Sequence, residues 1–108
     1  MPALVATEAR IESDPETVAA AVRAIVATQR ALKADVGLAT EVGRKLFPPG
    51  DAEMIADVVA RDLPYYDAAI SEDSIAGLNR FTRDMGLLDF DPAYDQVVAT
   101  QFSHLWTT

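Results

Sequence analysis

The chain contains no cysteine, a single histidine and few aromatic residues, which make up 7% of the sequence. The absence of cysteine excludes disulfides and thiolate metal sites. The single histidine, His104, excludes patterns such as His-Glu-x-x-His, in which paired histidines bind a metal. Because large aromatic side chains are scarce, the hydrophobic core predicted for 108 residues is modest.

Basic residues are also scarce. Nine Lys and Arg stand against 17 Asp and Glu, which gives a net charge of −8, and the basic residues do not cluster. Phosphate backbones and anionic membrane surfaces are bound by clustered positive charge, so no nucleic-acid or membrane-surface partner is predicted. No apolar run approaches the roughly 20 residues that span a bilayer. The first residues lack the basic and apolar regions of a signal peptide, as would also be true of a segment taken from within a longer chain.

The region from Ile70 to Leu88 carries the clearest local signals. Ser71 is a good N-cap, and Glu72 and Asp73 place negative charge in the first turn, where the helix dipole favours it. Gly86 is expected as the left-handed residue that ends the helix, with Leu87–Leu88 folding back on the last turn. Spacings of three and four residues predict one apolar face, formed by Ile75, Leu78, Phe81, Thr82 and Met85.

Four further helices are predicted along the chain. Asp14-Pro15-Glu16 is a strong helix start, because aspartate caps and proline suits the first helical position. Asp35 is expected to cap a helix over residues 36–47, with Leu38, Val42 and Leu46 inward. After the break at Pro48-Pro49-Gly50, Asp51 is expected to cap a helix that Pro64 ends. The last predicted helix covers residues 92–98.

The N-terminal run Ala3–Thr7 is predicted as a short strand or an extended arm, and residues 8–13 can add a helical turn. A lone strand needs a partner for its backbone groups. The expected fold is therefore mainly α, with about five short helices and one N-terminal strand or arm, in a single helical domain or fragment over residues 1–108.

The sequence offers few candidates for chemistry. The acids stand mainly where helices start, the glycines are isolated, and no serine has the context of a nucleophile elbow. Tyr65 and Tyr66, together with other aromatic residues, can be read as a ligand-binding wall or as packing along a seam between helices. The further members of this aromatic set are Phe47, Phe102 and Trp106. No catalytic residue, metal site or cofactor is predicted.

The order of these signals resembles the C-terminal part of the periplasmic substrate-binding proteins of ABC importers, in the class that takes nitrate, sulfonates, taurine and thiamine precursors. The resemblance covers nearly the whole chain. It rests on Leu4-Val5-Ala6-Thr7, Asp14-Pro15-Glu16, Ala21–Ile25, Asp62-Leu63-Pro64-Tyr65-Tyr66, Ile70-Ser71, Gly86-Leu87-Leu88, Tyr94-Asp95-Gln96-Val97-Val98 and Phe102.

This resemblance implies a non-catalytic solute-binding role, in the periplasm or cell envelope, with the importer's membrane subunits and a small solute as partners. It implies a type II binding-protein lobe, in which the arm Ala3–Thr7 would be the edge of a sheet whose other strands this sequence lacks. Most of the residues that line the family's cleft are also lacking, and only Tyr65 and Tyr66 remain as ligand candidates. The alternative is a free-standing helical interaction module that forms a homodimer or docks a partner, with self-association through the arm.

Overall fold

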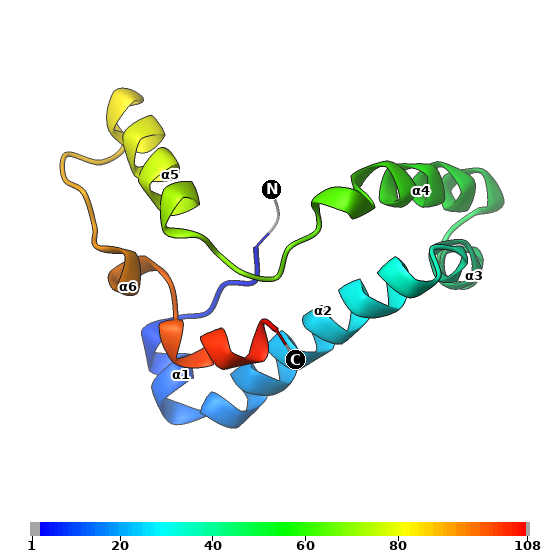
Figure 1. The fold of residues 1–108 in the computed structure, drawn as a ribbon, viewed down its shortest axis with the longest axis horizontal. Helices are drawn as coiled ribbons and strands as arrows, with labels where there is room; N and C mark the ends of the chain where they lie inside the picture. Colours follow the sequence, from blue (N-terminus) through cyan, green and yellow to red (C-terminus); the bar gives the residue numbers. More distant parts are fainter. Residues whose placement is uncertain (1–2, 108) are drawn as a thin grey trace. The chain divides into compact units, whose positions relative to one another are not determined.

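The computed structural model describes residues 3–107, which form helices and connecting segments and no β-strand. The chain divides into two compact units, the first ending at Ala68 and the second beginning at Ala69. The helices confirm the prediction of a mainly α fold. The prediction of a single domain concerns how the two units pack together, and it stays a prediction. The first unit contains α1 (Glu8–Ser13), α2 (Pro15–Ala34), α3 (Gly37–Leu46), α4 (Pro49–Asp62) and the 3₁₀ helix η1 (Leu63–Tyr65); the second contains α5 (Glu72–Asp84), α6 (Tyr94–Val97) and the 3₁₀ helix η2 (Thr100–Leu105) (Figure 1).

The N-terminal run is an arm, so the strand alternative was wrong for the chain as described. Residues 3–7 are exposed and have neither helical nor strand structure, and the side chains of Leu4 and Val5 are 53% and 86% exposed. A strand exists only where a neighbouring strand pairs with its backbone. The described residues of this chain provide no such neighbour, and the helical structure starts directly after Thr7.

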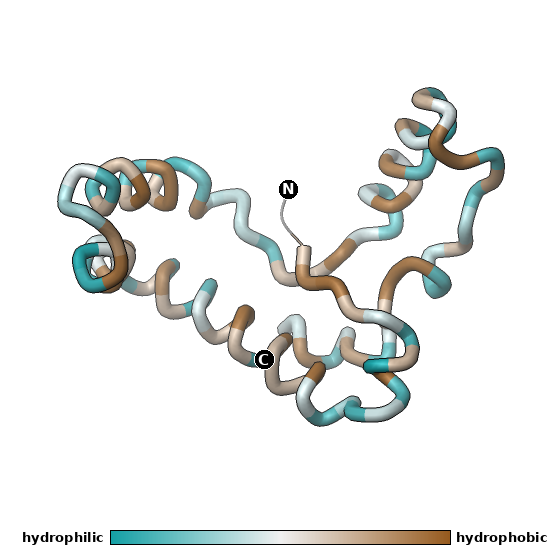
Figure 2. The backbone as a smooth tube through the Cα atoms, turned by 180° about the vertical axis from the view of Figure 1, so that it is seen from behind, coloured by the Kyte–Doolittle hydropathy of each residue, from teal (hydrophilic) through white to brown (hydrophobic). Residues whose placement is uncertain are grey.

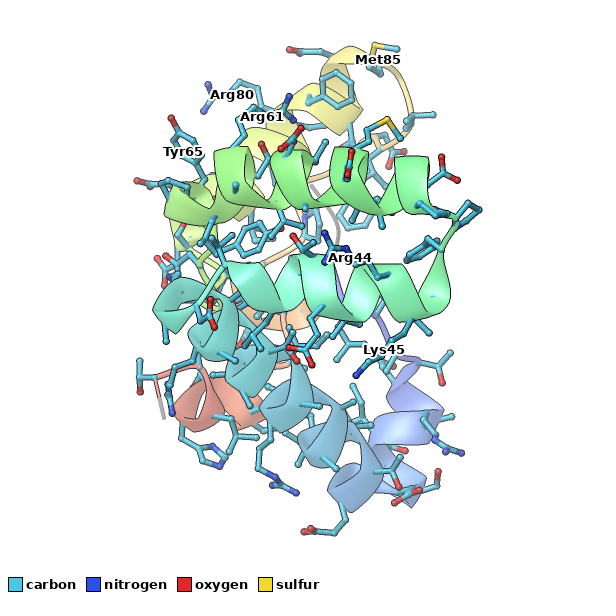
Figure 3. The ribbon with its side chains drawn as sticks, turned by 90° about the vertical axis from the view of Figure 1, so that its right-hand side faces the viewer. Arg44, Lys45, Arg61, Tyr65, Arg80 and Met85 are labelled. Carbon is cyan, nitrogen blue, oxygen red and sulfur yellow. The ribbon has the colours of Figure 1, made fainter. Side chains whose placement is uncertain are left out.

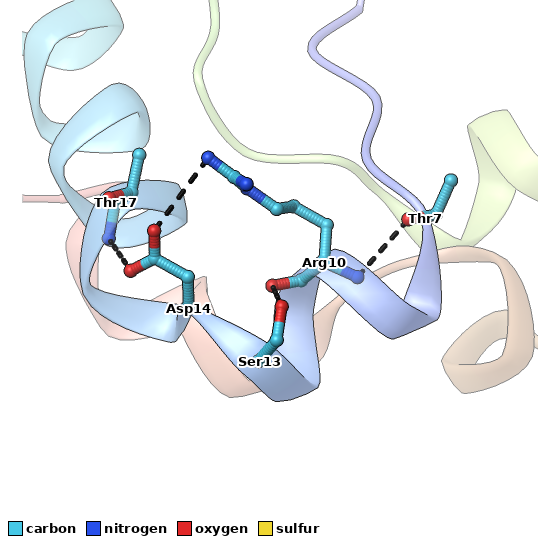
Figure 4. A network of polar contacts seen from close by, with 5 residues as sticks. All are labelled: Thr7, Arg10, Ser13, Asp14 and Thr17. Atoms are coloured by element: carbon cyan, nitrogen blue, oxygen red, sulfur yellow. Dashed lines mark hydrogen bonds and ion pairs between the residues drawn. The ribbon is translucent and has the colours of Figure 1, made fainter.

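The start of the first unit is held by two successive helix caps (Figure 4). The Thr7 hydroxyl accepts a hydrogen bond from the Arg10 amide at 3.1 Å, and the Asp14 carboxylate accepts one from the Thr17 amide at 3.2 Å. Arg10 also lies 3.7 Å from the Asp14 carboxylate. Asp14 and Pro15 therefore open α2 as predicted, and the helical turn expected over residues 8–13 is the short helix α1.

Two predicted caps in the middle of the chain were wrong. The N-cap of α3 is Val36, and the Asp35 carboxylate instead accepts a hydrogen bond from the Gly37 amide at 2.9 Å. Helix α4 starts at Pro49, so that Asp51 lies in its first turn and does not cap it. The reason is that Pro49 has no amide hydrogen to satisfy and its fixed φ suits the first helical position. Pro64 does end α4, as predicted, through the 3₁₀ turn η1.

Helices α3 and α4 form a helical hairpin whose closest contact is made by small residues. Gly43 and Ala52 are both buried, and a Cβ atom built on Gly43 would lie 3.5 Å from the Ala52 Cβ. Because the backbones approach at this point, the larger residues predicted to point inward do not fill the contact. Val42 and Leu46 are 50% and 70% exposed, which corrects their predicted inward placement.

In the second unit, α5 begins and ends where the sequence predicted. The Ser71 hydroxyl accepts a hydrogen bond from the Ser74 amide at 3.1 Å. Gly86 has φ +74°, and the amides of Gly86 and Leu87 donate to the carbonyls of Arg83 and Thr82, each at 2.9 Å. These two bonds are the Schellman ending of a helix. The backbone of residues 87 and 88 therefore folds back on the last turn, as expected.

The apolar face of α5 is mostly uncovered. Apolar and polar residues alternate along α5 in Figure 2, as the sequence pattern requires. Ile75 is buried, but the other large members of the face are exposed: Leu78 at 57%, Phe81 at 58% and Met85 at 62%. The helix is thus correctly predicted as amphipathic, while most of its apolar face is not packed within the second unit.

The last predicted helix is shorter than expected. Helix α6 covers only Tyr94–Val97, and the Gln96 side chain accepts a hydrogen bond from the Ala93 amide at 2.8 Å, which satisfies the N-cap backbone. The 3₁₀ helix η2 follows and was not predicted, because its Thr-Gln-Phe-Ser-His-Leu sequence has no apolar repeat of helical spacing.

Candidate functional site

The two tyrosines predicted as ligand candidates lie at the end of the first unit. Tyr65 is the last residue of η1 and is 81% exposed, and Figure 3 shows it close to the end of α4. Tyr66 follows as the C-cap of η1 and is half-buried. A small-molecule site normally encloses most of its ligand. Tyr65 could contact a ligand only as one wall of such a site, and its ligand role stays a prediction.

The segment that carries these tyrosines is fixed to α2 by one charged hydrogen bond. The Lys33 ammonium donates to the Tyr66 carbonyl at 2.6 Å. Lys33 lies in the last turn of α2, where a positive charge suits the helix dipole. In the structure it additionally ties two segments that are 33 residues apart in the sequence.

Next to the tyrosines, Arg61 and Asp62 form an ion pair with two contacts. The Arg61 Nε donates to Asp62 Oδ1 at 2.8 Å, and Nη2 donates to Oδ2 at 3.4 Å. These hydrogen bonds lower the pKa of Asp62 and raise the pKa of Arg61. Both side chains are largely exposed, so solvent screens the pair and it adds little to stability. The pair keeps both groups charged but creates no acid or base of unusual strength.

The second unit contains a pocket of about 460 Å³ along α5. Its volume falls within the range of small-molecule sites. Half of its lining residues, however, are charged and exposed to solvent. The lining residues are Glu72, Asp73, Ile75, Ala76, Asn79, Arg80, Arg83, Asp91, Pro92 and Tyr94.

Several polar groups of this pocket already have partners within the unit. Arg83 Nε lies 3.1 Å from the Asp91 carboxylate, and the Asn79 side-chain amide donates to the Pro92 carbonyl at 3.0 Å. The Tyr94 hydroxyl donates to the Ile70 carbonyl at 2.6 Å. These contacts hold the segment after α5 against the helix. The polar groups of the pocket therefore serve contacts within the unit.

No constellation typical of catalysis or metal binding is found among residues 3–107. His104 lies exposed in η2. Within the described residues, no group of three or more His, Cys, Asp or Glu side chains could hold a metal ion. No helix in the described part of the chain has the length and apolar character needed to cross a bilayer.

Comparison with known proteins does not assign the chain to a family. No family model, curated protein or solved structure matches it. The resemblance to ABC-importer binding proteins therefore rests on the sequence motifs alone.

The surfaces with the greatest capacity for interaction are apolar, and the sequence analysis only partly anticipated them. The arm was predicted, but Val42 and Leu46 on the open side of α3 were predicted to point inward. The close approach of Gly43 and Ala52 could have been anticipated from their small size, since small residues permit close helix contacts. Which residues of a helix face its neighbour depends on tertiary packing, which a single periodic pattern does not determine.

Proposed function

We propose that this chain acts as part of the solute-binding protein of an ABC importer, for small nitrogen- or sulfur-containing solutes, and that it has no catalytic role. In this proposal its helices support one lobe of a two-lobed binding protein in the periplasm or cell envelope. The importer's membrane subunits would receive the loaded protein. Tyr65 and Tyr66 are the ligand candidates.

The observation that carries the proposal is the arm at residues 3–7. Its apolar side chains are exposed, and none of the backbone groups of residues 3–6 is hydrogen-bonded to another described residue. Thr7, at its end, has φ −77° and ψ 153°, which is the extended region. An apolar segment with free backbone groups is well suited to join the edge of a sheet. The resemblance supplies such a sheet in the rest of the binding-protein lobe.

The test is solute binding by the full product of the coding sequence that contains these 108 residues. We expect the full product to bind taurine, nitrate, an alkanesulfonate or a thiamine precursor in calorimetric titrations. We expect the 108-residue chain alone to bind none of them tightly, because part of a cleft cannot enclose a ligand. Tight solute binding by a monomeric 108-residue chain, or no binding by a longer product, would contradict the proposal.

A second candidate function, a helical interaction module, is favoured by the exposed apolar side chains on α3, α4 and α5. A coding sequence that starts at Met1 and yields a stable dimer would support this candidate. A reading frame that extends far upstream would support the solute-binding proposal.

A further inference from the structure

The helical hairpin of the first unit has one apolar side that its own unit leaves open. Four large apolar side chains form this side, which we call the hairpin face. They are exposed by 50% at Val42, 70% at Leu46, 60% at Met54 and 41% at Val58. Amphipathic helices bury such stripes against another layer of structure.

Helix geometry places these four residues on one side of the hairpin. On α3, Val42 and Leu46 lie to one rotational side of Gly43, the residue at the helix contact. On α4, Met54 and Val58 lie to the same rotational side of Ala52. Since α3 and α4 run in opposite directions, these two sides coincide. Arg44 lies on the other side of the hairpin, next to α4 (Figure 3).

The chain exposes more area than compact folding would leave exposed. The chain exposes 8022 Å², whereas a compact monomer of 11.7 kDa exposes about 5,900 Å². Even two separate compact bodies with the lengths of the two units would expose together only about 7,000 Å². The remaining difference, roughly 1,000 Å², is spread over the whole chain, and it exceeds the roughly 800 Å² that each partner buries in a standard interface.

Charge indicates which occupant fits the hairpin face. Helix α3 carries Arg44 and Lys45 against Glu41, a net charge of +1. Helix α4 carries Arg61 against four acids, a net charge of −3; the acids are Asp51, Glu53, Asp57 and Asp62. A second copy of the hairpin offers an apolar face of the same size. Arg44 lies away from this face, but by the same helix geometry Lys45 on α3 and Asp51 on α4 lie on its side. Opposite charges therefore meet if α3 of one copy lies along α4 of the other.

We propose that the hairpin face of this chain binds the hairpin face of a second copy, with α3 of each copy against α4 of the other. The two hairpins together form a four-helix assembly around a shared apolar layer. This proposal concerns the 108-residue chain and does not depend on the solute-binding role.

The first test is the mass of the chain in solution across a range of concentrations, measured by light scattering after size exclusion. Val58→Glu places a charge on the hairpin face, and Ala60→Glu places the same charge on the same helix outside that face. We expect the unaltered chain to form a dimer. Val58→Glu should raise the dissociation constant of this dimer at least about tenfold, and Ala60→Glu should leave it nearly unchanged. Circular dichroism will check that both variants keep their helices.

The second test determines the arrangement of the two hairpins. Because the sequence has no native cysteine, a thiol reagent will react only at the introduced cysteine. Chains with Val42→Cys and chains with Met54→Cys are treated with a short bismaleimide, separately and as a mixture. We expect efficient cross-linking only in the mixture, because α3 of one copy faces α4 of the other. Efficient cross-linking of Val42→Cys alone would overturn this arrangement. A monomer at every concentration would overturn the dimer itself, whereas failure of solute binding by the full product would leave it standing.

Discussion

The contact between Gly43 and Ala52 makes a quantitative prediction about the stability of the first unit. A Cβ atom on Gly43 would meet the Ala52 Cβ at 3.5 Å and the Ala52 Cα at 3.6 Å, which are ordinary van der Waals distances. Gly43→Ala should therefore fit, and the better helix propensity of alanine should stabilise the chain by up to about 1 kcal/mol.

Gly43→Leu should have the opposite effect. Its additional carbon atoms would extend from a position that is already in contact with the fully buried Ala52. Overpacking of this kind costs typically about 1–3 kcal/mol, so we expect a net loss of up to about 2 kcal/mol after the gain in helix propensity.

The matched control is Gly50→Leu, in the first turn of α4, where an added Cβ would meet no atom within 4 Å. This control should change the free energy of unfolding by no more than about 1 kcal/mol. The assay is urea unfolding followed by circular dichroism, at one fixed protein concentration. If Gly43→Leu is as stable as Gly43→Ala, helices α3 and α4 do not approach each other at this point, and the hairpin is wrong.

Three further predictions concern the caps. Ser71→Ala should destabilise α5 by about 1 kcal/mol, because the Ser74 amide loses its acceptor, whereas Ser71→Asp should retain the stability. Gly86→Ala should cost about 1 kcal/mol, because φ +74° disfavours a Cβ atom; thermal unfolding measures it against Gly77→Ala, which should stabilise the same helix. Hydrogen bonds from the side chain and the backbone of Thr17 lower the pKa of Asp14, with a smaller contribution from Arg10. The stability that Asp14 contributes should be fully present above the ordinary pKa of an aspartate and lost as the pH falls through the lowered pKa, and Asp14→Asn should remove this pH dependence. Carboxyl NMR titration would contradict this reasoning if the pKa of Asp14 were not lowered.

The parts of the fold that the sequence predicted well are those that local chemistry decides. The start and the end of α5 depend on one hydroxyl, the charges of the first turn and one glycine, all within the helix or next to it. The start of α2 depends in the same way on Asp14 and Pro15. Each of these signals acts through backbone groups only a few residues away, so no knowledge of the tertiary structure was needed.

The incorrect predictions depend on choices between competing local signals or on tertiary contacts. At the start of α4, Pro49 and Asp51 were both suitable start residues, and the structure uses the proline as the first helical residue. The orientation of α3 follows from the small side chains at its contact with α4. The predicted ligand role of Tyr65 concerns a site with further walls, so its position in one chain does not decide that role.

The solute-binding proposal and the dimer proposal give the hairpin face different partners, and an experiment can distinguish them. In a larger binding protein, the arm would pair with a sheet and other parts of the lobe could cover the hairpin face. A dimer of the 108-residue chain that disappears in the full product would mean that the hairpin face is covered by the rest of that protein. A dimer that persists in the full product, and that Val58→Glu still weakens, would mean that the hairpin face serves association between copies. The same substitution tested in both proteins therefore separates a surface for assembly within one protein from a surface for pairing between two.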